Sequence, residues 1–176
     1  LTNVIEGGAQ ERGKRAGTEN VPGIMGLAAA LKEACDHIDE NAAKVSALRD
    51  QLIAGLSQIP HSALNGDPVH RLPGNVNFCF EGIEGESLLL LLDQAGICAS
   101  SGSACTSGSL DPSHVLLAIG RPHEVAHGSL RLSLCEWNTQ EDVDHILKEV
   151  PGIVAYLRSI SPVWKDLASG KKQFML

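Results

Sequence analysis

The segment HGSLRLSLCEW, residues 127 to 137, alternates apolar and polar residues and predicts a β-strand. Successive side chains of a strand point to opposite faces, so the leucines share one face and the serines share the other with Arg131. On that polar face the planar guanidinium of Arg131 can bind a carboxylate through two parallel hydrogen bonds. An ordinary surface ion pair is the alternative role for an arginine in this position.

The segments around this strand predict an α+β fold. Before it we expect a long amphipathic helix from Asn20 to about Ile59, a strand within 74–82, a short helix closed by Gly96 and a brief strand at 97–99. A helix at 111–120 precedes the strand, and a last helix follows it, with a capping box from Thr139 to Asp142 and a kink or split at Pro151. The expected architecture is a small, mostly antiparallel sheet covered by helices on one face, with a long N-terminal helix.

Length, charge and cysteine content narrow the class of protein. The 176 residues suit one domain with a real core, and the formal net charge of −7 disfavours nucleic acid or anionic lipid as the main partner. The five cysteines are widely spread and include no CxxC pair, which argues against a disulfide scaffold or a zinc site and for a reducing compartment. The longest aliphatic run, Leu88 to Leu92, is far too short to span a membrane. A cytoplasmic protein is expected, and its loop-like first twenty residues, without an initiator methionine, suggest a fragment.

The segment SSGSACTSG, residues 100 to 108, places Cys105 among small hydroxylated residues and glycines. A reactive cysteine needs exposure, an environment that favours its thiolate, and reach toward a substrate. The loop supplies exposure and reach, although no fixed base is adjacent. A flexible serine-rich loop without function is one alternative, and a redox protein with Cys98 as resolving thiol is another.

Three sequence motifs are informative because they occur together, in the order and spacing of one protein family. RAGTENV (15–21), SSGSACTSGSLDPSHVLLAIG (100–120) and GSLRLSL (128–134) resemble the C-terminal part of the NifS/IscS-type cysteine desulfurases. The resemblance covers almost the whole chain. It implies a homodimeric class V aminotransferase of pyridoxal 5′-phosphate (PLP) fold type I that converts L-cysteine to L-alanine and an enzyme persulfide. The resemblance further implies that the sulfur passes to iron–sulfur cluster assembly through a scaffold or another acceptor protein. With the charge and the cysteine spacing, we expect no nucleic acid or membrane partner and no metal site.

The resemblance also implies residue roles. Cys105 resembles the persulfide-forming cysteine, Arg131 the arginine that pairs with the substrate carboxylate, and Thr18 the threonine that reaches the PLP phosphate of the other subunit. Thr18 also has a physical warrant, because Gly17 permits close approach and a helix N-terminus follows. Selenocysteine lyase activity of the same fold and a non-catalytic module that docks a sulfur acceptor are the alternatives.

One departure from the family pattern concerns the cofactor. The family holds PLP as a Schiff base on a lysine that follows a serine-histidine motif, and no lysine of this sequence lies in such a motif. The chain therefore resembles the small C-terminal domain. We expect residues 1–19 to be the end of the large PLP-binding domain or an interdomain loop, and residues 20–176 to form the small domain with the catalytic-cysteine loop at 100–110.

Overall fold

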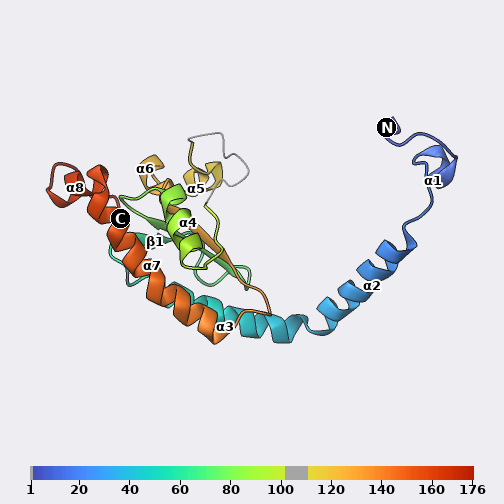
Figure 1. The fold of residues 1–176 in the computed structure, drawn as a ribbon, viewed down its shortest axis with the longest axis horizontal. Helices are drawn as coiled ribbons and strands as arrows, with labels where there is room; N and C mark the ends of the chain where they lie inside the picture. The colour runs from blue at the N-terminus through green and yellow to red at the C-terminus, as the bar shows by residue number, and fades with distance from the viewer. Residues whose placement is uncertain (1, 102–110) are drawn as a thin grey trace. The chain divides into compact units, whose positions relative to one another are not determined.

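The computed structural model describes residues 2–101 and 111–176, and within it the chain forms two compact units (Figure 1). The first unit is Leu1–Ile38 and the second is Asp39–Leu176. Cys105 lies outside the described residues. Each unit is described by itself.

The first unit consists of a loop, the short helix α1 (Gln10–Gly13) and the helix α2 (Val21–Asp36). Asn20 caps α2 by accepting a hydrogen bond from the backbone N–H of Gly23 at 3.1 Å. None of the sixteen residues of α2, all of them described, is buried, and its large apolar side chains face solvent. The helix predicted from Asn20 to Ile59 is wrong in one respect: it ends at Asp36, and His37, at φ −113° and ψ 10°, separates it from the next helix.

The second unit is built on one three-stranded antiparallel sheet of strand order β1-β2-β3. Its strands are β1 (Ser62–Leu64), β2 (Asn75–Phe80) and β3 (Ser129–Ser133). The alternation predicted for β3 is confirmed, because Leu130 and Leu132 are buried while Arg131 is exposed. The predicted strand at 97–99 is wrong: only Ser100 pairs, through a single bridge to Arg131. Strand β1 was not predicted.

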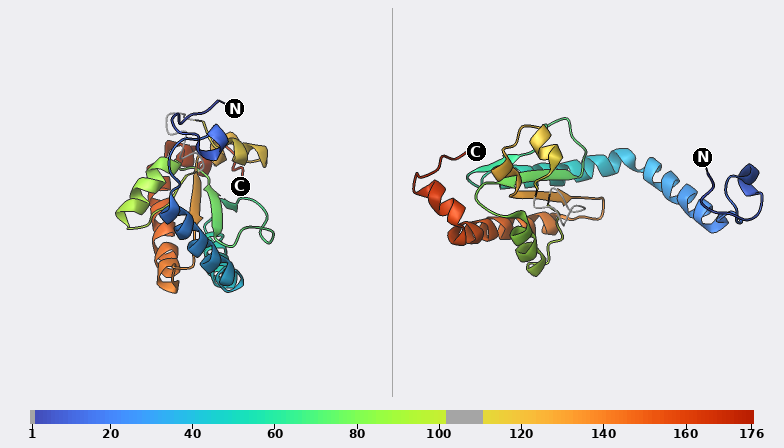
Figure 2. Two further views of the ribbon diagram at one scale, coloured as in Figure 1. Left: turned by 90° about the vertical axis from the view of Figure 1, so that its right-hand side faces the viewer. Right: turned by 90° about the horizontal axis from the view of Figure 1, so that it is seen from above.

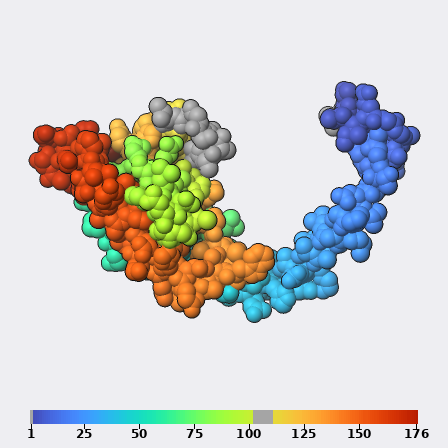
Figure 3. All heavy atoms as spheres, viewed as in Figure 1, coloured from blue at the N-terminus to red at the C-terminus, as the bar shows by residue number. Residues whose placement is uncertain are grey.

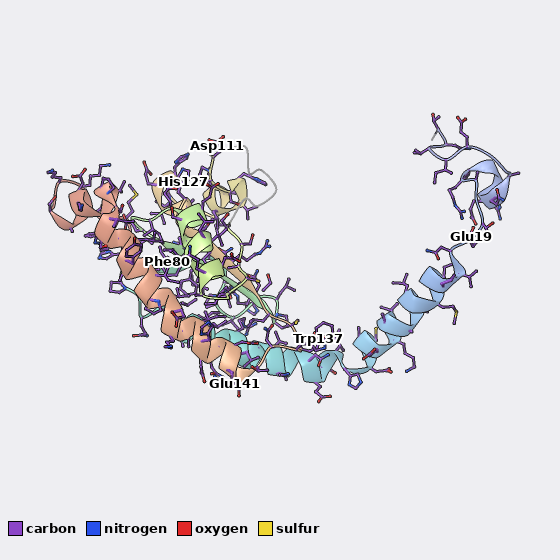
Figure 4. The ribbon with its side chains drawn as sticks, viewed as in Figure 1. Glu19, Phe80, Asp111, His127, Trp137 and Glu141 are labelled. Atoms are coloured by element: carbon purple, nitrogen blue, oxygen red, sulfur yellow. The ribbon has the colours of Figure 1, made fainter. Side chains whose placement is uncertain are left out.

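The main core lies between one face of the sheet and three helices, α3 (Ile38–Leu56), α4 (Gly85–Gln94) and α7 (Gln140–Ile160). Figure 2 shows α3 and α7 side by side beneath the sheet, and Gln140 of α7 donates a hydrogen bond to Gln51 of α3 at 2.7 Å. Phe80 points into this interior (Figure 4). The buried apolar residues of the three helices and the sheet form one cluster, which includes Leu52, Leu56, Val76, Phe78, Leu88, Leu92, Val143 and Val150.

Two short helices cover part of the opposite, polar face of the sheet. They are α5 (His114–Ala118) and α6 (His123–Ala126), and they bury Leu116, Val125 and Ala126 against Cys79. The expectation of helices on one face only is therefore wrong. The helix predicted at 111–120 is shorter than expected, because Ser113 rather than Asp111 occupies the N-cap position. Helix α6 was not predicted.

Helix α7 begins with the predicted capping box. The Thr139 hydroxyl accepts from the Asp142 backbone N–H, and the Asp142 carboxylate accepts from the Thr139 backbone N–H at 3.0 Å. The helix continues through Pro151 to Ile160, so the predicted split is absent from this fully described helix. After it come α8 (Pro162–Ala168) and a C-terminal segment. Figure 3 shows α4 and α7 adjoining each other on the surface of the second unit.

Candidate functional site

Arg131 lies in the middle of β3 on the polar face of the sheet. Its backbone pairs with Ser100 in both directions, with the Ser100 N–H donating to the Arg131 carbonyl at 3.0 Å and the Arg131 N–H donating to the Ser100 carbonyl at 2.6 Å. In the described part of the chain, no side chain accepts a hydrogen bond from the Arg131 guanidinium or forms an ion pair with it. Arg131 is also exposed.

The pairing of Arg131 with Ser100 connects two of the three predicted motifs. Ser100 and Ser101 directly precede the segment 102–110, which includes Cys105, and the described chain resumes at Asp111. Beyond it, Pro112 and Ser113 are buried. Both flanks of the Cys105 segment are thus held by the second unit, and the leading flank lies beside the backbone of Arg131.

A hydrogen-bonded network lies beside Arg131 on the polar face. Its centre is Asn65, which is 5% exposed. Its Oδ1 accepts from Nε of Arg121 at 2.6 Å, and its Nδ2 donates to Oδ1 of Asn77 at 2.6 Å and to Sγ of Cys79 at 3.2 Å. Asn77 is the Cα partner of Arg131 across the β2–β3 pairing. The network therefore connects Asn65 and Cys79, which are buried, with Asn77, the residue opposite Arg131.

This network was not predicted from the sequence. Alternation along β2 places Asn75, Asn77 and Cys79 on one face, and that signal could have placed Asn77 beside Arg131. The two partners that complete it, Asn65 and Arg121, are 56 residues apart in the chain. Their contact could not be read from local periodicity.

Thr18 is exposed in the first unit, just before α2. Gly17 precedes it at φ +100°, a backbone conformation that favours glycine. The charge of Arg15 is already used locally, because its guanidinium donates to the Gly17 carbonyl at 2.6 Å and pairs with Glu19. The residues near Thr18 thus fit one phosphate contact, a hydroxyl donor near a helix N-terminus.

The lysines do not fit the role of a Schiff-base residue. All seven lie in the described chain and all are exposed. A lysine that forms a Schiff base is activated by desolvation or by a neighbouring cation. The seven lysines therefore do not supply the covalent anchor of a PLP site.

The described cysteines differ in exposure, and all four are free thiols. Cys35, Cys98 and Cys135 are exposed, whereas Cys79 is buried. Within the described residues, no group of three or more histidine, cysteine, aspartate or glutamate side chains can hold a metal ion.

We predict that Cys79 resists alkylation in the folded chain. Burial raises the pKa of the Cys79 thiol, and the hydrogen bond from Asn65 and the charge of Arg121 oppose that rise only in part. Below its raised pKa the thiol stays protonated and unreactive, so at neutral pH Cys79 is expected to react about 100-fold more slowly than an exposed thiol.

Peptide mapping after brief iodoacetamide treatment checks the order of reaction. The sequence predicts that Cys105 is labelled first, and unfolding the chain in urea should bring Cys79 to the rate of the other thiols. Labelling of Cys79 or Cys135 ahead of Cys105 would contradict the prediction.

One protein family matches most of this chain. The aminotransferase class-V family matches residues 6–146, which include Thr18, Arg131 and the segment with Cys105. The chain belongs to this family.

Similar members of the class V family are named cysteine desulfurases. The chain is 55% identical over 176 residues to the cysteine desulfurase IscS of Clostridium botulinum strain Hall, an alignment that covers 98% of this chain and 44% of that protein. It is 60% identical over 160 residues to the IscS of Methanosarcina thermophila, covering 91% and 40%. It is 52% identical over 162 residues to the NifS of Azotobacter vinelandii, covering 92% and 40%. The chain spans less than half the length of these relatives.

Solved structures agree with this class V membership. A NifS-like protein superposes with a TM-score of 0.75 at 36% identity, covering 89% of this chain and 40% of that chain. The NifS-like protein from Rickettsia africae gives the same TM-score at 32% identity, covering 88% and 40%. The α+β fold with a small antiparallel sheet therefore matches a part of the NifS-like fold, as the sequence predicted.

Proposed function

We propose that the complete protein to which this chain belongs is a cysteine desulfurase. It would take sulfur from L-cysteine, leave L-alanine and carry the sulfur as a persulfide on Cys105. The observation that carries the proposal is the backbone pairing of Arg131 with Ser100, because it brings an exposed arginine next to the start of the Cys105 segment. Over nearly the whole of this chain, the relatives at 52 to 60% identity are named cysteine desulfurases, which supports the same assignment.

In the proposed reaction, Arg131 binds the α-carboxylate of L-cysteine and orients the substrate sulfur toward Cys105. PLP, when bound, accepts electron density from the substrate and so allows its carbon–sulfur bond to break. The Cys105 thiolate attacks the substrate sulfur and forms the sulfur–sulfur bond of a persulfide. The electron pair of the broken carbon–sulfur bond stays with the carbon, which takes up a proton to become the methyl group of L-alanine.

The remaining contacts of the site complete the proposal. Thr18 would donate its hydroxyl to the PLP phosphate held by the other subunit of a homodimer, and the Schiff-base lysine would come from the part of the protein that matches the rest of the relatives' length. We place residues 1–19 with the large domain and residues 20–176 in the small domain. The exposed apolar side chains of α2 would then pack against the large domain. A cytoplasmic location and a scaffold or other acceptor protein for the persulfide sulfur belong to the same proposal.

Among the described helices, none has both the length and the apolar character needed to cross a bilayer.

The deciding experiment measures alanine and sulfide formed from L-cysteine by the complete protein, with PLP and a thiol reductant present. We expect equal amounts of L-alanine and sulfide. The 176-residue chain alone is the control, and it should form neither product and give no borohydride-fixed PLP adduct at a single lysine. Adding L-selenocysteine as a competing substrate separates the desulfurase from a selenocysteine lyase. Absence of L-alanine from L-cysteine with the complete protein would refute the proposal.

A further inference from the structure

The side chain of Asn77 occupies the position opposite Arg131 on the polar face of the sheet. We propose that Asn77 is a second binding residue for the substrate α-carboxylate, its Nδ2–H donating to one carboxylate oxygen while the guanidinium of Arg131 binds the other. This inference rests on the proposed function and adds a residue to its site. It follows from the hydrogen-bond network on that face, from the strand order and from charge.

The Arg121 donor determines how the side-chain carboxamides of the network are oriented. An arginine side chain can only donate, so the atom of Asn65 that faces Nε of Arg121 at 2.6 Å must be its carbonyl oxygen. The Asn65 amide nitrogen then faces the other way and donates to Asn77 at 2.6 Å. The atom of Asn77 that receives this bond must be its own oxygen, Oδ1. The orientation of the Asn77 carboxamide is therefore set by chemistry, with its nitrogen pointing away from Asn65.

The strand order determines which way that nitrogen points. Asn65 continues β1 and donates its backbone N–H to the Asn77 carbonyl at 2.8 Å, so it flanks Asn77 on the β1 side. Arg131 flanks Asn77 on the β3 side, because β2 lies between the two outer strands. Directly opposed side chains of an antiparallel pair have Cβ atoms about 5 Å apart. The Asn77 Nδ2 therefore lies on the Arg131 side of its carboxamide.

The Asn77 nitrogen remains available for a ligand. In the described ranges 2–101 and 111–176, no residue accepts a hydrogen bond from Nδ2 of Asn77. Asn77 is half-buried, which leaves its free edge accessible. A carboxylate that already pairs with Arg131 offers a second oxygen to such a donor, and hydrogen bonds to a charged group are stronger than neutral ones.

The surrounding charge favours an anion. Arg121 and Arg71 also donate hydrogen bonds to residues of this face. Their acceptors are neutral oxygens and not carboxylates. Arg121 donates to Asn65 and to the Leu64 carbonyl, while Arg71 donates to Asn75 and to nearby carbonyls. The contacts of Arg121 leave its positive charge without a carboxylate partner, and this charge adds to the attraction for an anion. The charge of Arg71 also attracts Asp50 and Asp67, so it contributes less.

The test compares two isosteric substitutions in the complete protein. Asn77→Asp keeps the oxygen that receives the Asn65 bond and replaces the free amino group with a carboxylate oxygen, which removes the donor and repels the substrate. Because the new carboxylate can also pair with Arg131 itself, Asn77→Ala, which removes the donor without adding a charge, is expected to raise KM in the same direction, and an unchanged KM in Asn77→Ala would overturn the inference. The matched control is Asn75→Asp, on the same strand and face, where the oxygen is likewise held by an arginine, Nη2 of Arg71 at 3.1 Å. Asn75 lies opposite Ser133 instead of Arg131.

We expect Asn77→Asp to raise the KM for L-cysteine at least about 10-fold with a smaller change in kcat, and Asn75→Asp to change KM less than about 2-fold. L-alanine binding, followed by backbone amide signals in nitrogen-15 NMR, should weaken in the same order. A KM unchanged in Asn77→Asp, or raised equally by both substitutions, would overturn the inference while leaving the desulfurase in place. A wild-type protein that is inactive on L-cysteine would instead refute the proposed function.

Discussion

Replacing Cys105 with serine in the complete protein is expected to reduce sulfide release from L-cysteine to below about one-thousandth of the wild-type rate, because a serine hydroxyl neither ionises near neutral pH nor forms a persulfide. Binding of PLP and of L-cysteine should be unchanged, since the proposed contacts to phosphate and carboxylate come from Thr18 and Arg131. The measurements are sulfide release, the absorbance of bound PLP and persulfide detection by mass spectrometry. Arg131→Ala should instead mainly weaken the binding of L-cysteine.

The matched control for this substitution is Cys98→Ser. Cys98 is an exposed free thiol seven residues earlier in the chain, so general effects of removing a thiol near the segment should appear in both variants. We expect Cys98→Ser to keep at least about half of the wild-type rate. A Cys105→Ser protein that still releases sulfide at the wild-type rate would exclude Cys105 as the sulfur acceptor, and loss of activity in Cys98→Ser alone would favour the redox interpretation.

Local patterns predicted the parts of this fold whose causes are local. The leucines around Arg131 alternate because one face of β3 is buried, and the same periodicity correctly placed the guanidinium on the polar face. The capping box at Thr139 and Asp142 was predicted because its partners are three residues apart. Gly96 follows α4 at φ +76°, which a helix-ending glycine adopts readily.

The errors arose where distant residues decide the outcome. The apolar spacing continues from α2 into α3, but only α3 buries its apolar face, and His37 separates the two helices. Periodicity records amphipathicity and does not show which stretch has a partner to pack against. Helix α6 is four residues long, too short for a periodic signal. It exists because Val125 and Ala126 pack on Cys79.

The residues of the candidate site also fall into those that a local motif predicts and those that only the folded sheet brings together. The family strings pointed to Cys105, Arg131 and Thr18, because short motifs carry those roles. Asn77 acquires its orientation only through Asn65 and Arg121, which lie in other segments of the chain. A hydrogen-bond network of this kind is a property of the folded sheet.

The second large effect is expected at Gly128, the residue that precedes β3. A Cβ atom at this position would lie 2.1 Å from the carbonyl oxygen of Phe80 and 3.1 Å from that of Ile83, and both are backbone atoms that no side-chain rotation can move. The same two segments are joined by the hydrogen bond from the Phe80 N–H to the Gly128 carbonyl at 2.9 Å. Gly128→Ala must therefore separate β3 from the end of β2, and this displacement would also shift Arg131.

We expect Gly128→Ala to lower the free energy of unfolding by about 3 kcal/mol or more, which for a chain of this size lowers the melting temperature by about 6 to 12 °C. The control is Gly152→Ala, at an exposed position inside α7 where a Cβ would meet no atom within 4 Å. That substitution should stabilise the protein by about 0.5 to 1 kcal/mol, because alanine favours a helix over glycine. Thermal unfolding followed by circular dichroism measures both, and a Gly128→Ala melting temperature within about 2 °C of wild type would show that the β2–β3 junction adapts to a side chain.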